Sequence, residues 1–572
     1  PKCARARNLF RVIAAARNML SMFLLFLFSL GEAAKIAVVS YNLGTSHLMF
    51  AGAIADTLVD AGHTVHFFQV QQDDMIRTNG SARAHRHILI PSVAHNIWND
   101  MAFRYNPFKK FLIETPSFFI NATRSFDQSC HDVLAQREFL EKLGREEKYD
   151  IGISEAYGFH GFGLLYILGV REYMLSAGIP FQPAFASFFN IPTPISYVTS
   201  CLDAEGSLEA PDLSYFRRVY NTALHAMNYW IYERWADKHT AIFRKFYPEM
   251  PHLEDLVKSS SLILVNTASL LEMPRPTTHK VLHIGGIAES VKRQKKPLPD
   301  DIMRVVNGTR PVVVVSFGTL ARTIYIQGEL LMAFLNAFAR FPDYDFIWKF
   351  DEAEIHADMF DKYPNVYTYK WLPQKQLLNH RNTRAFITHC GLNSLIESAH
   401  AGVPMVAVPL FTDQQYNAAV ARRRRIAVYV DKVELSEQTI GDALHAVLRE
   451  KSYARNSLLV QAQLRAFPRQ PKRELTEFVD YVHRFGAPRG GMFELPPQSF
   501  ILTNSLDIYI PATAAAVVAA GLFAFYLAYL YGDYFGIVKI KIEVTPIDEF
   551  LERFAGLDDE SEDEWDRKHK EE

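Results

Sequence analysis

A strand, a glycine turn and a helix follow one another between residues 385 and 402, and this order strongly constrains the fold. Ala385–Thr388 is predicted to end a buried strand, and Leu392–Ala401 is predicted to form a helix. Gly402 ends that helix, and Pro404 prevents it from resuming. In α/β proteins this arrangement presents free backbone N–H groups to a phosphate. The segment therefore predicts a parallel α/β sheet with a phosphate-binding turn.

Polar side chains around this turn extend the prediction to a nucleotide. Asn393 and Ser394 fall in the first helical turn, where their side chains add hydrogen-bond donors. Glu397 lies four residues after Asn393 on the same helix face, and its carboxylate can accept hydrogen bonds from a sugar diol. The segment is therefore typical of a nucleotide-diphosphate site.

The wider stretch from Trp371 to Gln414 resembles the donor-binding signature of the UDP-glycosyltransferases, the family that includes the glucuronosyltransferases. It begins WLPQKQLL and, after a short spacer, continues AFITHCGLNSLIESAHAGVPMVAVPLFTDQQ. The resemblance covers this stretch without a gap and extends more weakly over nearly all the chain. It implies two Rossmann-like domains facing across a cleft, the architecture called GT-B, with UDP-sugar in the second domain and acceptor in the first.

The resemblance also implies a role for each position that contacts the base or the sugars. Trp371 would stack on uracil, and Gln374 would bond the edge of the base. Glu397 would accept hydrogen bonds from the ribose hydroxyls. Asp413 and Gln414 would bond the hydroxyls of the transferred sugar.

Three further elements are expected to hold the diphosphate. The resemblance assigns this role to four residues of the signature, His389, Gly391, Asn393 and Ser394. A second glycine turn, with Ser316, Gly318 and Thr319, is expected to open toward the nucleotide. Arg275, within the run MPRP, matches a position of the family that contacts the phosphates from the first domain. No cofactor or metal is implied, since the UDP-sugar is itself the donor substrate.

Length, charge and cysteine content limit the classes of protein to which the chain can belong. With 572 residues the chain is too long for one core, and a net charge of −2 provides no basic field for nucleic acid. The four cysteines have neither metal-ligand spacing nor the pattern of a disulfide framework. In an oxidising compartment, Cys130 with Cys201 is the plausible pair.

The first domain is predicted over residues 35–290. A strand, KIAVVSY, leads through a polar loop into the helix His47–Ala61, and the strand HTVHFFQV follows. His47 lies at the carboxyl end of the first strand, where doubly wound sheets bind their ligands. Phe185–Ser200 and Tyr215–Tyr232 are expected to form an apolar acceptor pocket.

The second domain is predicted over residues 301–470, and the resemblance implies that residues 471–505 return to pack on the first domain. Val312–Val315 has no polar residue, as expected for a strand buried on both faces. Asp343 and Asp345 spell the Asp-x-Asp of metal-dependent glycosyltransferases, but they precede a strand at its amino end, away from the expected ligand edge. We interpret that match as chance.

Two apolar runs predict the topology. Residues 1–34 have the basic, apolar and small-residue regions of a signal peptide, although Met19 is a possible start and a buried N-terminal helix is the alternative. Residues 508–531 predict one membrane-spanning helix, with residues 532–572 as a cytosolic tail. Residues 101–120 fit either a helix lying on a membrane or a core helix.

These features predict a single-pass type I protein of the endoplasmic reticulum membrane with lumenal catalytic domains. Lys568 and Lys570 resemble a dilysine retrieval signal at the carboxyl end. The candidate N-glycosylation sites are Asn79, Asn121 and Asn307, which are meaningful only in a secreted setting. A homo-oligomer is possible.

A transferase needs a base for the acceptor's proton, and His47 is the candidate because an imidazole titrates near neutral pH. Glu155 occupies a position where the family usually has Asp, and it is expected to orient the imidazole. The predicted function is inverting, metal-independent transfer of glucuronic acid or glucose from UDP to a hydroxyl of a small lipophilic acceptor. The alternatives are a non-catalytic nucleotide-sugar-binding membrane protein on the same scaffold and an adhesion or carbohydrate-binding protein.

Overall fold

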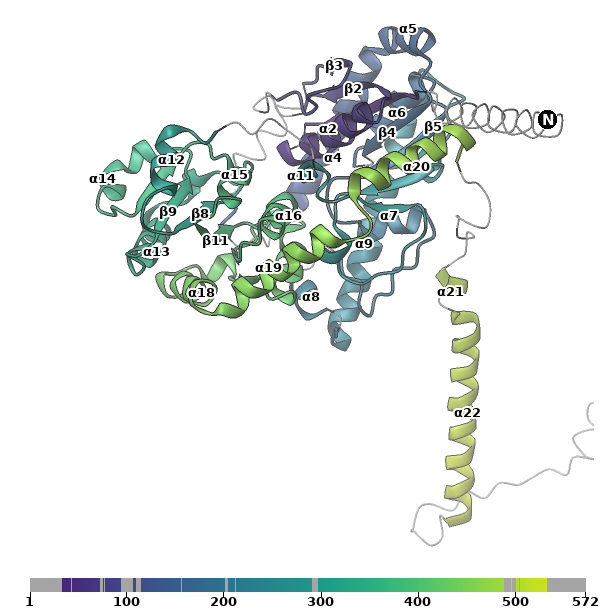
Figure 1. Ribbon diagram of the computed structural model, residues 1–572. Coiled ribbons are helices and arrows are strands. Elements are labelled where there is room, and N and C mark those ends of the chain that lie inside the picture. Colours follow the sequence, from purple (N-terminus) through teal and green to yellow (C-terminus); the bar gives the residue numbers. More distant parts are fainter. Residues whose placement is uncertain are drawn as a thin grey trace, which may run out of the picture. The chain divides into compact units, whose positions relative to one another are not determined.

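The computed structural model describes residues 33–531, with gaps at 43, 73–75, 77, 94–105, 110–114, 156, 201–203, 211, 291–296, 488–494, 496–499 and 504. The chain divides into two compact units, residues 1–496 and residues 497–572, and Figure 1 labels many of their described helices and strands. The tail and dilysine predictions lie outside the described residues, as do residues 1–32 of the predicted signal peptide and residues 101–105 and 110–114 of the 101–120 segment.

The first unit contains two parallel sheets. Within the described residues, the first sheet has the strand order β3-β2-β1-β4-β5-β6-β7 and the second has the order β10-β9-β8-β11-β12-β13. The strands of the first sheet are β1 (Lys35–Tyr41), β2 (Thr64–Val70), β3 (Arg86–Ile90), β4 (Ile151–Glu155), β5 (Glu172–Ala177), β6 (Leu262–Val265) and β7 (Val281–His283). Those of the second are β8 (Val312–Ser316), β9 (Asp345–Lys349), β10 (Val366–Tyr369), β11 (Thr383–Thr388), β12 (Met405–Ala407) and β13 (Ala427–Tyr429).

Helices connect these strands, as parallel pairing requires. In the first domain they are α2 (Thr45–Asp60), α4 (Thr115–Ala135), α5 (Arg137–Glu147), α6 (His160–Ile167), α7 (Pro183–Phe188), α8 (Ala204–Glu209), α9 (Tyr215–Arg244), α10 (Leu253–Lys258) and α11 (Ile287–Ser290). In the second they are α12 (Asp300–Val306), α13 (Gly328–Ala339), α14 (Ala357–Phe360), α15 (Gln374–Leu378), α16 (Leu392–Ala401), α17 (Gln414–Arg423), α18 (Glu437–Arg449) and α19 (Lys451–Ala466).

Each sheet lies between two apolar cores because its strands are apolar on both faces. In β1, Val39 points into one core of the first sheet and Val38 into the other. In β8, Val314 and Val315 divide in the same way between the two cores of the second sheet. The prediction that Val312–Val315 is buried on both faces is confirmed.

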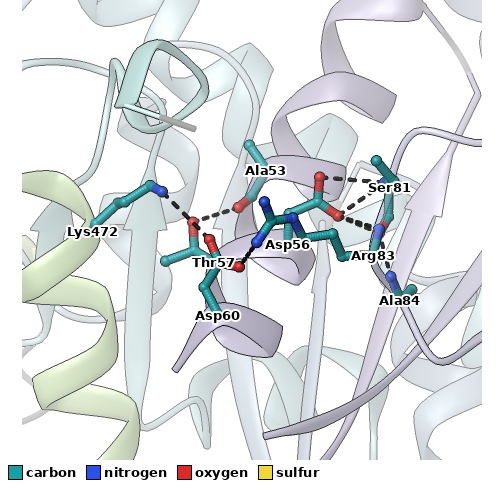
Figure 2. Close-up of polar contacts among 9 residues, drawn as sticks. Ala53, Asp56, Thr57, Asp60, Ser81, Arg83, Ala84 and Lys472 are labelled. Atoms are coloured by element: carbon teal, nitrogen blue, oxygen red, sulfur yellow. Dashed lines mark hydrogen bonds and ion pairs between the residues drawn. The ribbon is translucent and has the colours of Figure 1, made fainter. Parts of the chain in front are cut away.

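After α19 the chain returns to the first domain as α20 (Pro471–Phe485). Leu475, Val479 and Val482 of α20 are buried in the same core as Ile36 and Val38. Outside this core, Lys472 forms an ion pair with Asp60 in α2 (Figure 2), in which Nζ lies 3.6 Å from a carboxylate oxygen. The apolar face of α20 and this surface ion pair hold the segment on α2.

Figure 2 also shows how the loop that leads into β3 is fixed to α2. Asp56 of α2 is buried, and its carboxylate accepts hydrogen bonds from the Ser81 hydroxyl at 2.5 Å and from the Ala82 and Arg83 N–H groups at 2.9 and 3.0 Å. The Arg83 guanidinium donates to Asp60 one turn further along α2. The loop therefore satisfies a carboxylate that would be costly to bury alone.

Three predictions about the first unit are refined by the structure. Ala34, placed in the leader by sequence, is fully buried and its carbonyl accepts from the Thr64 N–H, so it belongs to the folded domain. Cys130 is buried and Cys201 lies outside the described residues, so their pairing stays a prediction. Asp345 begins β9 at its amino end, as predicted, and its carboxylate pairs with Arg310 at 2.7 Å.

The second unit contains α21 (Phe500–Thr503) and α22 (Leu506–Tyr531). Among the described residues, α22 is the helix that is long and apolar enough to cross a membrane, with 26 residues and a mean hydropathy of 2.0. Its bounds extend the predicted span, 508–531, by two residues at the amino end.

Candidate active site

The predicted base and its predicted partner lie together at the carboxyl edge of the first sheet. His47 is in the first turn of α2, just after β1, and Glu155 is the last residue of β4. Because β1 and β4 pair directly, their carboxyl ends bring the two side chains together. His47 Nδ1 lies 3.0 and 3.1 Å from the two carboxylate oxygens of Glu155. This geometry leaves Nε2 as the nitrogen available to a substrate.

A glycine that sequence reasoning missed makes room for this pair. Gly178 directly follows β5, and its N–H donates to Glu155 Oε1 at 2.8 Å. A Cβ at this position would lie 2.5 Å from Glu155 Oε1 and 2.6 Å from His47 Nδ1. Its position after a strand that neighbours β4 was the available signal, because the carboxyl ends of neighbouring strands form one edge.

The surroundings of His47 favour its protonated form. Burial by itself lowers the pKa of His47, but the Glu155 carboxylate outweighs burial and Asp413 adds to its effect. The pKa of His47 is therefore raised above its ordinary value of 6.5. An imidazole in this setting can take a proton from a hydroxyl and be stabilised as the imidazolium.

The two predicted glycine turns meet around His389 in the second domain. A Cβ at Gly318 or at Gly391 would each lie 2.6 Å from His389 Nε2. Burial lowers the pKa of His389 to about 4, so its ring is neutral at physiological pH. Ser316 ends β8 and its hydroxyl accepts from the Gly318 N–H at 3.4 Å, whereas Thr319 is exposed.

The helix that follows the second turn has the predicted bounds, Leu392–Ala401, and ends at Gly402 with a left-handed φ of 72°. Cys390, directly before the helix, is fully buried among apolar residues and also has a positive φ, 59°. The Cys390 N–H donates to the Thr388 hydroxyl at 3.1 Å, and the prediction that the N–H groups at the start of the helix bind a phosphate stays a prediction.

The predicted base- and ribose-binding residues also come together. Gln374 Nε2 donates to Ser394 Oγ at 3.2 Å and to Glu397 Oε2 at 2.6 Å. Trp371 precedes α15 and its side chain is 65% exposed. A ring that large and that exposed is available for stacking rather than committed to a core.

The two residues expected to contact the sugar differ in their surroundings. The Asp413 carboxylate accepts hydrogen bonds from Asn417 at 2.8 Å and from Thr412 at 3.1 Å, and burial raises its pKa. Gln414 is buried, and its side-chain oxygen accepts from the Leu410 and Phe411 N–H groups at 2.9 and 3.2 Å. The side-chain oxygen of Gln414 thus holds the loop before α17 in place. The amide nitrogen of the same side chain is the atom that could bind a ligand.

A second residue missed from sequence links the two domains at this site. Asn266, just after β6, donates from Nδ2 to the Gly178 carbonyl at 3.2 Å and to Asn393 Oδ1 at 3.1 Å. It therefore connects the loop beside His47 with the helix of the predicted phosphate site. Its distance from Asn393 in sequence, 127 residues, leaves no local signal for this contact.

Arg275 lies in the first domain beside Phe181. Its Nη1 donates to the Phe181 carbonyl, and its guanidinium carbon is 5.2 Å from the centroid of the Phe181 ring. Its Nε and Nη2 are buried and have no hydrogen-bond partner within the described part of the chain. These two nitrogens are the part of Arg275 that an anionic ligand would satisfy.

The predicted acceptor segments pack differently from expectation. Phe185 and Phe188 of α7 are buried in the core of the first sheet, where Phe185 contacts Tyr157 and Tyr232. The inner side of α9 packs against α7, but Phe216 and Trp230 of α9 are 82% and 55% exposed. The stretch 215–232 therefore does not line a pocket along its whole length, because one side of the helix faces outward.

The fold matches those of solved glycosyltransferases. CalG4, the calicheamicin glycosyltransferase, aligns with a TM-score of 0.53 at 15% identity, over 79% of this chain and 99% of that chain. Phytolacca americana UGT2, complexed with UDP-2fluoro-glucose and pterostilbene, aligns with a TM-score of 0.52 at 17% identity, over 79% and 100%. The predicted GT-B architecture is confirmed.

Curated relatives match over most of their length. The chain is 26% identical over 543 residues to the putative UDP-glucuronosyltransferase ugt-47 of Caenorhabditis elegans, covering 92% of this chain and 98% of the relative. It is 26% identical over 512 residues to the 2-hydroxyacylsphingosine 1-beta-galactosyltransferase of Mus musculus, covering 88% and 90%. The family model described as UDP-glucoronosyl and UDP-glucosyl transferase matches residues 34–539. With that match and this architecture, the chain belongs to the UDP-glucuronosyl and UDP-glucosyl transferase family and is an enzyme that transfers a sugar from UDP.

Proposed function

We propose that this enzyme transfers glucuronic acid or glucose from UDP to a hydroxyl of a small lipophilic acceptor, with inversion at the anomeric carbon. One observation carries the proposal: the His47–Glu155 pair, with Nδ1–Oε1 at 3.0 Å, lies beside the loop that Asn266 links to Asn393. These contacts support the proposal that two domains bring a base and a diphosphate site to one place.

In the proposed reaction, His47 Nε2 takes the proton of the acceptor hydroxyl as its oxygen bonds to the anomeric carbon. The bond from that carbon to the diphosphate oxygen breaks, and UDP leaves with the electron pair. The transition state has oxocarbenium character, as in glycoside hydrolysis. Glu155 keeps Nδ1 protonated and stabilises the imidazolium.

The departing diphosphate would be stabilised by N–H donors and by the positive charge of Arg275. His389 is neutral at physiological pH and so contributes hydrogen bonds rather than charge. The backbone N–H groups at the start of α16 and the partnerless Nε and Nη2 of Arg275 supply the remaining donors. Trp371 and Glu397 would hold the uracil and ribose, which fixes the nucleotide while the sugar departs.

The donor sugar is proposed from the relatives. Names among them specify glucuronosyltransferases and a galactosyltransferase, so UDP-galactose joins UDP-glucuronic acid and UDP-glucose as a candidate donor. Turnover of each donor with one generic phenol, followed by analysis of the anomeric configuration of the product, decides the sugar and the stereochemistry. Retention of configuration would refute the single-displacement mechanism.

His47→Ala tests the assignment of the base. UDP affinity should stay near the wild-type value, while turnover should fall about 10²–10⁴-fold, the usual contribution of a positioned base. His252→Ala is the matched control, because His252 also pairs with a carboxylate, Asp237, but lies outside the site. If His47→Ala turned over an aliphatic alcohol as fast as the wild type does, His47 would not be the base of the reaction.

We also propose that the enzyme resides in the endoplasmic reticulum membrane with its sheets in the lumen. The apolar helix α22 and the family membership support membrane attachment, and the apolar run before the first domain supports the orientation. Protease added to sealed microsomes should remove only the residues after α22. If the two-sheet unit were digested in sealed microsomes, it would lie on the cytosolic side and the proposed orientation would be wrong.

A further inference from the structure

The amino-terminal half of α9 presents an outward face of apolar and aromatic side chains. The large members of this face are strongly exposed: Tyr215 (65%), Phe216 (82%), Val219 (53%), Tyr220 (51%), Met227 (40%) and Trp230 (55%). Successive members are separated by one, three or seven positions, spacings that keep them on one side of a helix. The exposed residues between 215 and 230 include no charged side chain. We call this surface the α9 outer face.

The inner side of the same helix is partly polar, and hydrogen bonds fix it against the domain. Asn221 is buried and donates to the Ile195 and Val198 carbonyls at 3.0 and 2.9 Å. Asn228 is buried two helical turns later and donates to the Ser200 hydroxyl at 2.9 Å. Rolling α9 to hide its aromatic side chains would leave these amides unpaired at high cost. The outward orientation is therefore built into the fold.

The size of the α9 outer face argues against a second copy as its occupant. Sixteen helical residues span about 24 Å, and a helix with its side chains is about 10 Å across. The face therefore offers roughly 250 Å², well below the roughly 800 Å² per partner of a stable protein interface. A bilayer surface imposes no such requirement, since single interfacial helices bind it with a face of this kind.

Its chemistry fits the boundary of a lipid bilayer. Tyr and Trp side chains are enriched at the membrane–water interface because they combine an apolar ring with a polar group. Arginines stand at its margins: the Arg218 guanidinium lies 5.9 Å from the Tyr215 ring centroid, and that of Arg234 lies 5.8 Å from the Trp230 ring centroid. Arginines at such positions can extend their charged ends toward water.

We propose that the α9 outer face inserts into the interfacial layer of the bilayer that α22 crosses. The apolar helix α22 keeps the two-sheet unit at a membrane, so a weak contact is enough to hold this face on the lipid. One consequence rests on the proposed function. α9 packs on α7, and both helices carry parts of the segments expected to contact the acceptor, so a lipophilic acceptor dissolved in the bilayer would meet the first domain next to the expected binding region (Figure 1).

The contact is tested in the full chain reconstituted in phosphatidylcholine nanodiscs. An environment-sensitive dye is attached to Phe216→Cys, and to Leu459→Cys as the control, since Leu459 on α19 is also exposed, at 55%. Nitroxide-labelled lipid should quench the dye at position 216 several-fold more than the dye at 459. UDP binding confirms that both variants are folded, and Trp230→Cys repeats the measurement 14 residues further along α9.

Two outcomes would overturn the proposal. In one, dyes at positions 216 and 459 are quenched equally by lipid. In the other, the dye at 216 is shielded without lipid quenching and two copies of Phe216→Cys cross-link, which would assign the face to a second copy. Because quenching needs no turnover, failure of the contact is distinguishable from failure of the proposed reaction.

Supply of the acceptor through the bilayer is tested separately, by the KM for two acceptors. The double variant Phe216→Ser and Trp230→Ser should raise KM several-fold for a membrane-partitioned phenol, with KM for a water-soluble phenol unchanged. Equal changes for the two acceptors would refute supply of the acceptor through the bilayer.

Discussion

Gly178→Ala should separate the catalytic pair without disturbing nucleotide binding. The new Cβ would lie 2.5 Å from Glu155 Oε1 and 2.6 Å from His47 Nδ1, where ordinary contact begins at 3.4 Å. Both groups must therefore withdraw by about 0.8–0.9 Å, or the loop after β5 must move by that amount. Gly178 does not have the positive φ that favours glycine, so the strain comes from this contact alone.

The size of the effect follows from that displacement. A shift of about 1 Å in a catalytic group costs roughly 10²-fold in rate, which is about 2.7 kcal/mol of transition-state stabilisation. We expect turnover with an aliphatic alcohol to fall by about that factor. Calorimetric affinity for UDP should stay within about twofold, because the base and ribose contacts lie in the second domain.

Gly44→Ala is the matched control for this prediction. A Cβ at Gly44 would lie 3.7 Å from His47 Cδ2, an ordinary contact with the same imidazole, and the residue is extended, with φ −168°. Turnover of Gly44→Ala should stay within a few-fold of the wild type. If Gly178→Ala turned over as fast as the wild type, the reasoning would be refuted. Such a result would show that the separation of His47 and Glu155 does not govern the rate.

Three other predictions address the nucleotide, the pH dependence and the topology. Trp371→Ala should weaken UDP affinity by about 1–3 kcal/mol with little change in thermal stability, since the ring is 65% exposed; unchanged calorimetric affinity would remove it from the base site. In Glu155→Gln the acid limb of the kcat/KM pH profile should move to lower pH, because the carboxylate raises the pKa of His47 and a base must be unprotonated; a shift to higher pH would contradict the pairing. Endoglycosidase should change the mobility of protein made in animal cells, through the exposed Asn79 or Asn307; an unchanged mobility would argue against lumenal exposure.

Local elements were largely predictable because their signals are local. α16 has its predicted bounds, since Gly402 and Pro404 leave a single place for the helix to end. α6 begins at His160 because Phe159 adopts a left-handed φ of 51°, which a residue of a right-handed helix cannot have. Periodicity alone does not report such a backbone choice, which depends on how Phe159 packs in the core of the first sheet.

Domain membership is less predictable because segments from the first domain join the second core. Ala268, Leu271 and Met273, which follow β6, are buried in the same core as Val312 and Val314 of β8. Phe108 is likewise buried in the other core of the second sheet, where its ring centroid lies 5.3 Å from that of Phe317. Each of these segments has the sequence of an ordinary apolar stretch. The core that it joins depends on how its side chains fit there, and its neighbours in the sequence do not indicate which core that is.

The sequence by itself determined the strand–turn–helix order, the UDP-glycosyltransferase family and the residue types available for the chemistry, because period, capping and motif spacing are properties of adjacent residues. Only the tertiary structure decided which of these residues meet. His47 and Glu155 are 108 residues apart and become partners because β1 and β4 pair in parallel. Gly178 matters because of the space that this pair needs, and the aromatic side of α9 faces outward because Asn221 and Asn228 hold the opposite side inward. Packing and hydrogen bonding between distant segments decide which residues meet and which side of a helix faces outward. No local pattern in the chain carries this information.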